Sequence, residues 1–268
     1  MIDLRRPQVM GILNVTPDSF SDGGLFVGQD AALEQARKMV AEGASIIDVG
    51  GESTRPGAEP VSVAEEIRRV IPIIELIANN LDTNISIDTS KAEVMQAALD
   101  TGANMINDVQ ALLNHGCLEV ACNSDVPVCL MHSKGTPQTM QKNPSYRDVL
   151  ADVFDYLSER IDTCIKAGID RNRLVIDPGF GFGKTLQHNL ALAKNLDRFK
   201  SFKLPILVGV SRKSMFGALL DAEVDERLYG SLAMTALLID KGATIIRTHD
   251  VAATVDTLKV VQAINENK

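Results

Sequence analysis

The segment Gly43-Ala44-Ser45-Ile46-Ile47-Asp48-Val49 decides the fold, because it shows the unit from which the chain is built. A Gly-Ala pair closes a helical stretch and a short apolar run follows at once. The unit recurs as a weak internal repeat at Gly102-Ala103 and Gly242-Ala243, and less tightly at Gly168-Ile169. Glycine suits the left-handed residue that follows a helix end. The repeat therefore predicts helix-to-strand junctions along the whole sequence.

Eight short runs rich in Ile, Val and Leu alternate with helical patterns. Their continuous apolar character is typical of parallel strands that are buried on both faces. The predicted strands are residues 9–13, 45–49, 85–88, 105–107, 128–131, 174–177, 206–210 and 245–247. Between the second and third runs, Ser62-Val-Ala-Glu65 forms a capping box that begins a helix. Pro72 lies inside that helix and is expected to kink it.

Eight strand–helix units in 268 residues predict one domain over residues 1–268, folded as a TIM (β/α)8 barrel. Such a barrel needs about 250 residues. The alternative is an open, doubly wound sheet. No Gly-rich dinucleotide-binding turn follows the first strand, which favours the barrel. In barrels of this kind the active site lies at the C-terminal ends of the strands.

Composition limits the class of protein. Hydrophobic residues make up 45% and charged residues 23%, which are values of a globular chain. The net charge of −8 argues against nucleic acid or an anionic membrane as a partner, although a local positive cluster could still hold a small anion. No apolar run reaches about 18 residues, and the N-terminus lacks a signal-peptide pattern. Four cysteines without a C-x-x-C pair predict reduced thiols in a cytoplasmic protein.

Polar residues follow every predicted strand. Each has a plain structural explanation when taken alone, since Asp and Ser cap helices, Asp-Pro makes turns, and a single His or Lys is usually structural or solvated. Together they are expected to point into one cavity. The residues are Asn14, the segment 50–57, Asp88-Thr89-Ser90, Asn107-Asp108, His132, the segment 177–185, Ser211-Arg212-Lys213-Ser214 and Arg247-Thr248-His249-Asp250.

The residue types suggest what that cavity binds. The carboxylates of Asp88 and Asp177 and the amide of Asn107 suit the N–H and C=O edge of a flat heterocycle. Arg247 and His249 bring positive charge to the last strand, near where barrels often bind phosphate. Two long loops, residues 14–30 and 50–60, are placed to close over the ligand. The residues alone thus predict an enzyme for a planar substrate with an anionic group.

These residues lie in motifs that resemble the dihydropteroate synthase family of pterin-binding enzymes. Met10-Gly-Ile-Leu-Asn-Val-Thr-Pro-Asp-Ser-Phe-Ser-Asp-Gly-Gly24 and Val49-Gly-Gly-Glu-Ser-Thr-Arg-Pro-Gly-Ala58 are similar to the family's two long signatures. Five shorter motifs follow in the family's order, over nearly the whole chain: Ile87-Asp-Thr-Ser-Lys91, Ile106-Asn-Asp108, Asp177-Pro-Gly-Phe-Gly-Phe-Gly-Lys-Thr185, Ser211-Arg-Lys-Ser214 and Arg247-Thr-His-Asp-Val251. One departure is Ser133-Lys134 after His132, where the family pattern would place Met at 133.

The resemblance implies an activity and a site. The family joins p-aminobenzoate to 6-hydroxymethyl-7,8-dihydropterin diphosphate, releasing pyrophosphate. By the motif positions, the catalytic residues would be Asp88, Asp177, Lys213, Arg247 and His249. The pterin diphosphate would contact Thr54, Asp88, Asn107, Met131, Asp177, Lys213, Arg247 and His249. The aminobenzoate would contact Phe20, Thr54, Arg55, Pro56, Phe182, Lys213 and Ser214. The resemblance also implies that Asn14 binds Mg2+ and that the enzyme is a homodimer.

The charges of the implied substrate suggest a reaction route in which the diphosphate leaves first and a cationic pterin methylene forms.

Two alternative functions would share parts of the same motif pattern. A pterin-binding methyltransferase acting on methyltetrahydrofolate would share the two Asp and the Asn of the pterin grip. A non-catalytic paralogue would bind pterin without turnover. The intact long motifs, Lys213 and the pair Arg247 and His249 favour the synthase.

Overall fold

The computed structural model describes residues 2, 4, 6–16, 24–53, 57–136 and 138–266, with the backbone alone for 24–27. Within them, eight parallel strands form one sheet. Most expected strands are confirmed to within one residue at each end. The strands are β1 Gln8–Asn14, β2 Ile46–Gly50, β3 Asn84–Asp88, β4 Met105–Asp108, β5 Val128–Met131, β6 Leu174–Asp177, β7 Leu207–Val208 and β8 Ile245–Thr248.

The sheet closes on itself as the barrel prediction requires. β1 pairs with both β2 and β8, and neighbours in sequence pair in parallel from β1 to β6. The last gap, between β6 and β7, is bridged by Ile176 and Ile206. Regular pairing of β7 is shorter than expected, because Ile206 bridges to β6 and the chain leaves the sheet after Val208. The open doubly wound alternative is therefore wrong.

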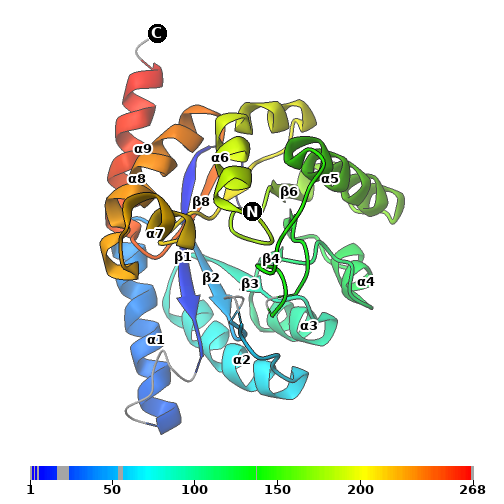
Figure 1. Ribbon diagram of the computed structural model, residues 1–268. Helices are drawn as coiled ribbons and strands as arrows, with labels where there is room; N and C mark the ends of the chain where they lie inside the picture. The colour runs from blue at the N-terminus through cyan, green and yellow to red at the C-terminus, as the bar shows by residue number, and fades with distance from the viewer. Residues whose placement is uncertain are drawn as a thin grey trace.

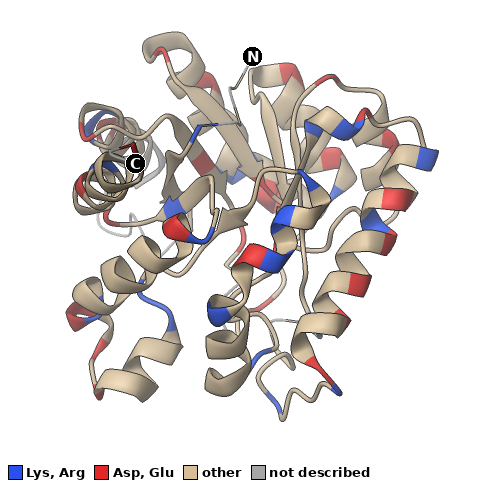
Figure 2. Cartoon of the chain, turned by 90° about the horizontal axis from the view of Figure 1, so that it is seen from above, with Lys and Arg blue, Asp and Glu red and all other residues tan. Residues whose placement is uncertain are grey.

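Helices form the outer layer around the strands (Figure 1). The helix start at Ser62 is confirmed, since the Ser62 side chain accepts a hydrogen bond from Glu65 N, while the Glu65 carboxylate accepts from Arg68 and Arg69; α2 continues through Pro72. No helix in the described part of the chain is long and apolar enough to cross a membrane. The helices are α1 Gly24–Ala41, α2 Val63–Asn80, α3 Ala92–Thr101, α4 Cys117–Cys122, α5 Val149–Lys166, α6 Leu186–Lys194, α7 Ser214–Leu220, α8 Leu228–Asp240 and α9 Val251–Glu266, with 3-10 turns η2 Arg171–Arg173, η3 Leu196–Phe202 and η4 Val224–Glu226. Lys and Arg are interspersed with Asp and Glu over these helices (Figure 2).

Alternation along each strand divides the apolar residues into two cores. Side chains that point outward pack on the helices and form the larger core. Side chains that point inward form a separate plug inside the barrel, completed by two residues from the N-terminus. The inner core consists of Ile2, Leu4, Met10, Ile46, Met105, Cys129, Val175, Leu207 and Ile245. The barrel is thus filled at this level, and a ligand must bind beyond it.

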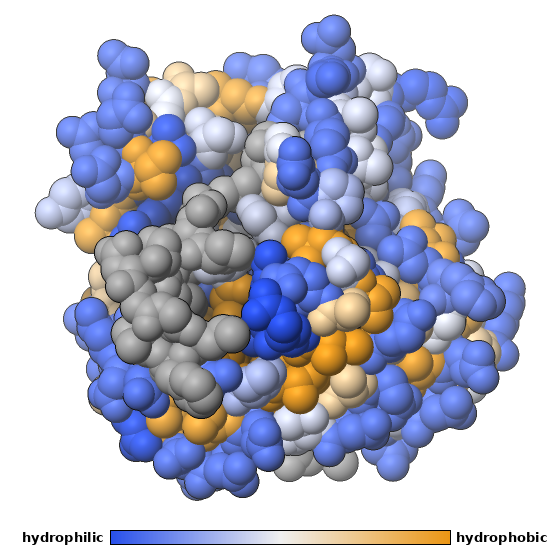
Figure 3. Space-filling view, turned by 90° about the horizontal axis from the view of Figure 1, so that it is seen from below, coloured by the Kyte–Doolittle hydropathy of each residue, from blue (hydrophilic) through white to orange (hydrophobic). Residues whose placement is uncertain are grey.

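The C-terminal ends of the strands define one face of the molecule. Figure 3 shows it from below, the direction in which the arrowheads of β1 and β2 point in Figure 1. Strongly hydrophilic side chains gather near the middle of this face, and hydrophobic ones border them. This arrangement matches the expected position of the site.

Candidate active site

A polar layer lies directly on the apolar plug. Because side chains alternate along a strand, the residue two positions after an inner apolar residue also points into the barrel. At those positions stand Asp48, Asn107, Met131, Asp177 and Arg247. Asp88, at the end of β3, joins them. The expectation that polar strand ends converge is thereby confirmed for Asp88, Asn107, Asp177 and Arg247.

Arg247 lies at the centre of the layer. Its Nε donates to Asp48 Oδ2 at 2.6 Å and its Nη2 donates to Asp88 Oδ2 at 2.7 Å. Burial lowers the pKa of Arg247, but the charges of Asp48 and Asp88 outweigh burial and raise the pKa above its ordinary value. Arg247 therefore remains a cation at every physiological pH.

Asp48 is a site residue that the sequence analysis missed. It is fully buried within β2, where its Oδ2 also accepts a hydrogen bond from Asn107 Nδ2 at 3.1 Å. Its Oδ1 has no hydrogen-bond partner among the described residues. The expected site residues stand at or after a strand end, whereas Asp48 precedes the end of β2 by two positions. A charged residue at an inward position of an apolar strand was the signal that would have found it.

The carboxyl groups of Asp88 and Asp177 have raised pKa values. Burial raises the pKa of Asp88 to about 7, against the opposing effect of Arg247 and with a further increase from Asp48. Burial likewise raises the pKa of Asp177 to about 6, although Gly179 N donates a 2.7 Å hydrogen bond to Asp177 Oδ1. Ionisable groups with such shifts cluster at functional sites.

Lys213 supplies a second cation from the β7 turn. It precedes α7, and Ser214 is the first residue of that helix. Burial lowers the pKa of Lys213 to about 8, and the charge of Arg247 lowers it further, against Asp177 and Asp88. Its Nζ lies 4.2 Å from the centre of the Phe182 ring. This places Phe182 and Lys213 side by side, which fits their expected shared contact with one substrate.

The β7 and β8 turns are tied together at the edge of the site. Arg212 has a left-handed backbone, with φ 55°, and its Nε donates to Asp250 Oδ2 at 3.0 Å. His249 Nδ1 lies 3.0 Å from Ser211 Oγ, which also accepts from His249 N. These contacts fix His249 against the β7 turn and thus bring the last two strand ends together.

Residues 10–249 match the model of the pterin binding enzyme family. The chain is 53% identical over 262 residues to the dihydropteroate synthase of Haemophilus influenzae, covering 98% of this chain and 95% of that protein. The chain belongs to the dihydropteroate synthase family. It is therefore an enzyme of the transferase class, as predicted.

Solved members of the family share the fold. The dihydropteroate synthase of Yersinia pestis, solved with a sulfonamide drug complex, has a TM-score of 0.94 at 49% identity and covers 99% of this chain and 96% of its own. The Xanthomonas albilineans enzyme in complex with 7,8-dihydropteroate has a TM-score of 0.90 at 46% identity, with 98% and 95% covered.

The structure describes some of the other site residues that the resemblance implies, and the rest lie outside the described residues. Met131, at the end of β5, is almost fully buried and stands opposite Asp177 in the strand register. Asn14 ends β1 opposite Gly50. Phe20, Thr54, Arg55 and Pro56 lie outside the described residues, so their assignment to the aminobenzoate stays a prediction.

Some polar residues at the strand ends have a structural role instead. Asp108 follows Asn107 but accepts hydrogen bonds from Ser90 Oγ and from the backbone N–H groups of Gln110 and Leu112. Its carboxylate therefore shapes the turn after β4. This is the plain explanation that holds for an isolated strand-end Asp.

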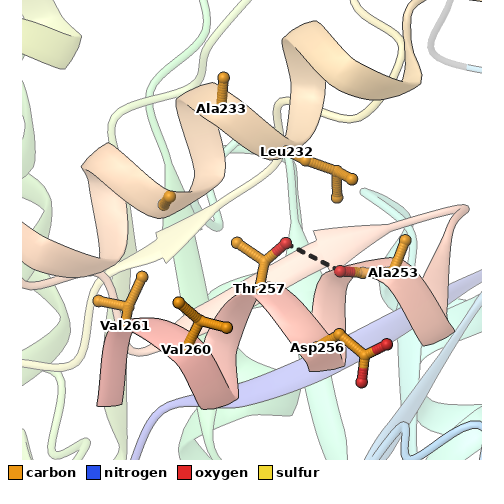
Figure 4. Close-up of a pocket in the computed structure, with 8 residues that line it drawn as sticks. Leu232, Ala233, Ala253, Asp256, Thr257, Val260 and Val261 are labelled. Carbon is orange, nitrogen blue, oxygen red and sulfur yellow. Dashed lines mark hydrogen bonds between the residues drawn. The ribbon is translucent and has the colours of Figure 1, made fainter. Parts of the chain in front are cut away.

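A shallow hollow lies away from the strand ends, between α8 and α9. Figure 4 shows Leu232 of α8 and Thr257, Val260 and Val261 of α9 around it. Thr257 Oγ1 donates to Ala253 O at 2.8 Å, so its hydroxyl is satisfied within the helix. The lining is thus mostly apolar, unlike the polar layer at the strand ends.

Proposed function

We propose that the chain catalyses the dihydropteroate synthase reaction, joining p-aminobenzoate to 6-hydroxymethyl-7,8-dihydropterin diphosphate to give 7,8-dihydropteroate and pyrophosphate. The observation that carries this is the buried layer in which Arg247 lies between Asp48 and Asp88, next to Asn107 and Asp177. The carboxylates of Asp88 and Asp177 and the amide of Asn107 match the N–H and C=O edge of a pterin. The relative solved with 7,8-dihydropteroate supports the assignment.

The proposed chemistry begins with departure of the diphosphate. Loss of the diphosphate from a carbon attached to an electron-rich pterin gives a cationic methylene. Arg247 and His249 would stabilise the charge that grows on the leaving group. The aminobenzoate amine is already neutral at pH 7 and needs no strong base before it attacks. Enclosure by the segments after β1 and β2 would keep water from capturing the cation; the first of these is shorter than the expected loop of residues 14–30, because α1 begins at Gly24.

Magnesium is part of the proposal, through Asn14. Among the described residues, no three His, Cys, Asp or Glu side chains lie together as a metal site. Asn14 offers an amide oxygen at the end of β1, and diphosphate oxygens would complete the shell, which fits the oxygen-rich, partly hydrated coordination of Mg2+. The bound ion would supply additional positive charge to the leaving diphosphate.

Pyrophosphate release tests the function and the site together. The native chain should release pyrophosphate and form dihydropteroate when given pterin diphosphate, p-aminobenzoate and Mg2+. Arg247→Ala should lose most of this activity, since removing one preorganised charge costs about 100- to 1,000-fold in rate. A folded native chain that forms no dihydropteroate would overturn the proposal.

The timing of bond cleavage has its own test. If the diphosphate leaves before attack, the rate of cleavage should be insensitive to substituents that change the nucleophilicity of the aminobenzoate amine. A rate that rises in proportion to nucleophilicity would contradict the dissociative route.

We also infer a homodimer in the cytoplasm. The free cysteines suit the reducing cytoplasm.

The surface of α8 and α9 supports the homodimer. The twelve residues from Leu228 to Ile239 in α8 include no charged side chain. A helix that is apolar on all sides is usually covered, yet Tyr229 and Leu237 are 81% and 59% exposed, and Val260 of α9 is 60% exposed. A second copy packed on the α8–α9 hollow would cover this surface.

Light scattering of the purified protein tests the dimer. The native chain should have twice the mass of one chain, and Leu237→Glu should shift it toward the monomer, because the new charge would be buried in the interface. A monomeric native chain would contradict the inference.

A further inference from the structure

The turn after β6, residues 178–184, is held by a buried lysine, Lys184. Lys184 is only 2% exposed. Its Nζ lies 2.8 Å from Gly179 O, 2.9 Å from His132 Nδ1 and 3.1 Å from Phe182 O. An ammonium group has three N–H donors. These three contacts therefore satisfy it with atoms of the protein alone.

His132, which follows β5 directly, is suited to accept a hydrogen bond from this lysine. Burial lowers the pKa of His132 to about 3, and the charge of Lys184 contributes. The imidazole is therefore neutral at pH 7, and its Nδ1 can accept from the ammonium group. The Tyr156 ring packs edge-on against it, with 4.9 Å between the ring centres. The strand-end histidine thus serves as an acceptor fixed in place by packing.

The turn lies directly on the backbone that follows β5. A Cβ added to Gly179, which has φ 72°, would lie 1.9 Å from His132 O. A Cβ added to Gly183 would lie 2.4 Å from Lys134 O. The two segments approach so closely that no side chain fits between them. Lys184 crosses this junction and joins its two sides.

The same turn presents two groups to the polar layer. Gly179 N donates to Asp177 Oδ1, so the turn orients that carboxylate. The Phe182 ring lies beneath Lys213 Nζ. A displacement of the turn would therefore move Asp177 and Phe182 together, one on the pterin side and one on the aminobenzoate side of the proposed site.

We propose that Lys184 is a positioning residue for the proposed synthase reaction: by joining His132 to the carbonyl oxygens of Gly179 and Phe182, its ammonium group holds the β6 turn in the form that presents Asp177 and Phe182 to the substrates. This rests on the proposed function. The lysine touches no reacting atom and acts only through the turn. Four protein acceptors surround its Nζ, if the 3.4 Å contact with His132 O is included.

Steady-state kinetics of Lys184→Met tests the proposal. Met keeps the length of the side chain and removes the donors. The KM for both substrates should rise, and kcat/KM should fall by about 100-fold, since misplacing reacting groups by about 1 Å costs that much. Lys38→Met is the control, because the Lys38 side chain is 67% exposed in the last turn of α1, where its Nζ lies 3.9 Å from Glu42 Oε1, and it should keep both KM values.

The KM separates positioning from stability. A variant that only unfolds more easily has fewer active molecules, which lowers kcat and leaves KM unchanged. Unchanged KM values in folded Lys184→Met would overturn the proposal. A native chain that makes no dihydropteroate would instead overturn the proposed function, so the two failures are distinguishable.

A pair of His132 variants keeps the test decisive if Lys184→Met fails to fold. In His132→Asn the amide oxygen can take the position of Nδ1 and accept from Lys184, so KM should stay within about threefold of native, whereas His132→Leu should raise it as Lys184→Met does. Equal KM values in the two variants would contradict the role of the Lys184–His132 contact.

Discussion

A buried lysine, Lys184, and a half-buried one, Lys213, lie at neighbouring strand ends and differ in how the protein satisfies them. Burial lowers the pKa of Lys184 to about 7 and that of Lys213 to about 8. Lys184 Nζ has a protein acceptor for each of its donors. Lys213 Nζ has no hydrogen bond to any described residue and lies over the Phe182 ring. Lys184 thus stabilises the β6 turn of the site, whereas the Nζ of Lys213 in the β7 turn remains available to a ligand.

The difference follows from the energy of burying charge. An ammonium group removed from water without partners is costly, so a chain normally pairs it or exposes it. Proteins keep such local conflicts mainly at functional sites. Lys213, whose Nζ has no acceptor among the described residues, is thus expected to bind substrate. Lys184, whose Nζ has protein acceptors, is expected to fix the geometry of the site.

The largest expected effect comes from Gly179→Ala in the β6 turn. A left-handed Ala costs about 1–2 kcal/mol, and its Cβ would collide with His132 O, which is backbone and cannot move aside. The free energy of unfolding in urea should fall by more than about 4 kcal/mol, a loss seen only when packing is broken. Gly168→Ala is the control, because it has φ 105° but nothing within 4 Å of the added Cβ, and it should lose only the backbone part. Equal losses in the two variants would show that the junction tolerates a side chain.

Lys213→Met should affect catalysis more than stability. Removing a cation that faces Asp177 and Asp88 should lower kcat/KM by about 100- to 1,000-fold. The free energy of unfolding should stay the same or rise, because the substitution also removes a partly desolvated charge that has no hydrogen bond to a described residue. Kinetics and urea unfolding on the same preparation measure both. A large loss of stability would mean that Lys213, like Lys184, is part of the framework.

Gly181→Ala tests the contact between the two turns. Gly181 has φ 81°, and an added Cβ would lie 3.1 Å from Lys213 Cδ, the middle of a flexible side chain. We expect a loss of about 1–2 kcal/mol in stability from the backbone and a change in the KM of aminobenzoate from the displaced lysine. A variant with native KM would show that Lys213 can shift without consequence.

The titration of the two lysines is expected to change the free energy of unfolding by at most about 1.4 kcal/mol per lysine for each unit of pH. A lysine whose pKa is lowered by folding binds its proton more readily in the unfolded chain, so stability rises with pH between the folded and unfolded values. The window runs from about 7 to 10.5 for Lys184 and from about 8 to 10.5 for Lys213. The native-minus-variant difference in unfolding free energy, measured for each Lys→Met variant from pH 7 to 10, should increase with pH. A flat difference would contradict the lowered pKa values.

Much of the site could be predicted from the sequence, because parallel strands in a barrel end on one face. Asp88, Asn107, Asp177 and Arg247 follow apolar runs directly, and the structure brings them into one layer. Asp48 escaped prediction because it stands within a strand. The partners of Lys184 escaped as well, since no spacing relates it to His132, which lies 52 residues away.

The sequence by itself determined the alternation of strand and helix, the number of units and the family motifs, because these depend on neighbours along the chain. Only the tertiary structure decided which polar groups meet. The pairing of Arg247 with Asp48 joins residues 199 positions apart, and the different fates of Lys184 and Lys213 depend on which acceptors closure of the barrel places within reach. Hydrogen bonds and desolvation act over a few ångströms in space, so a linear pattern cannot specify them.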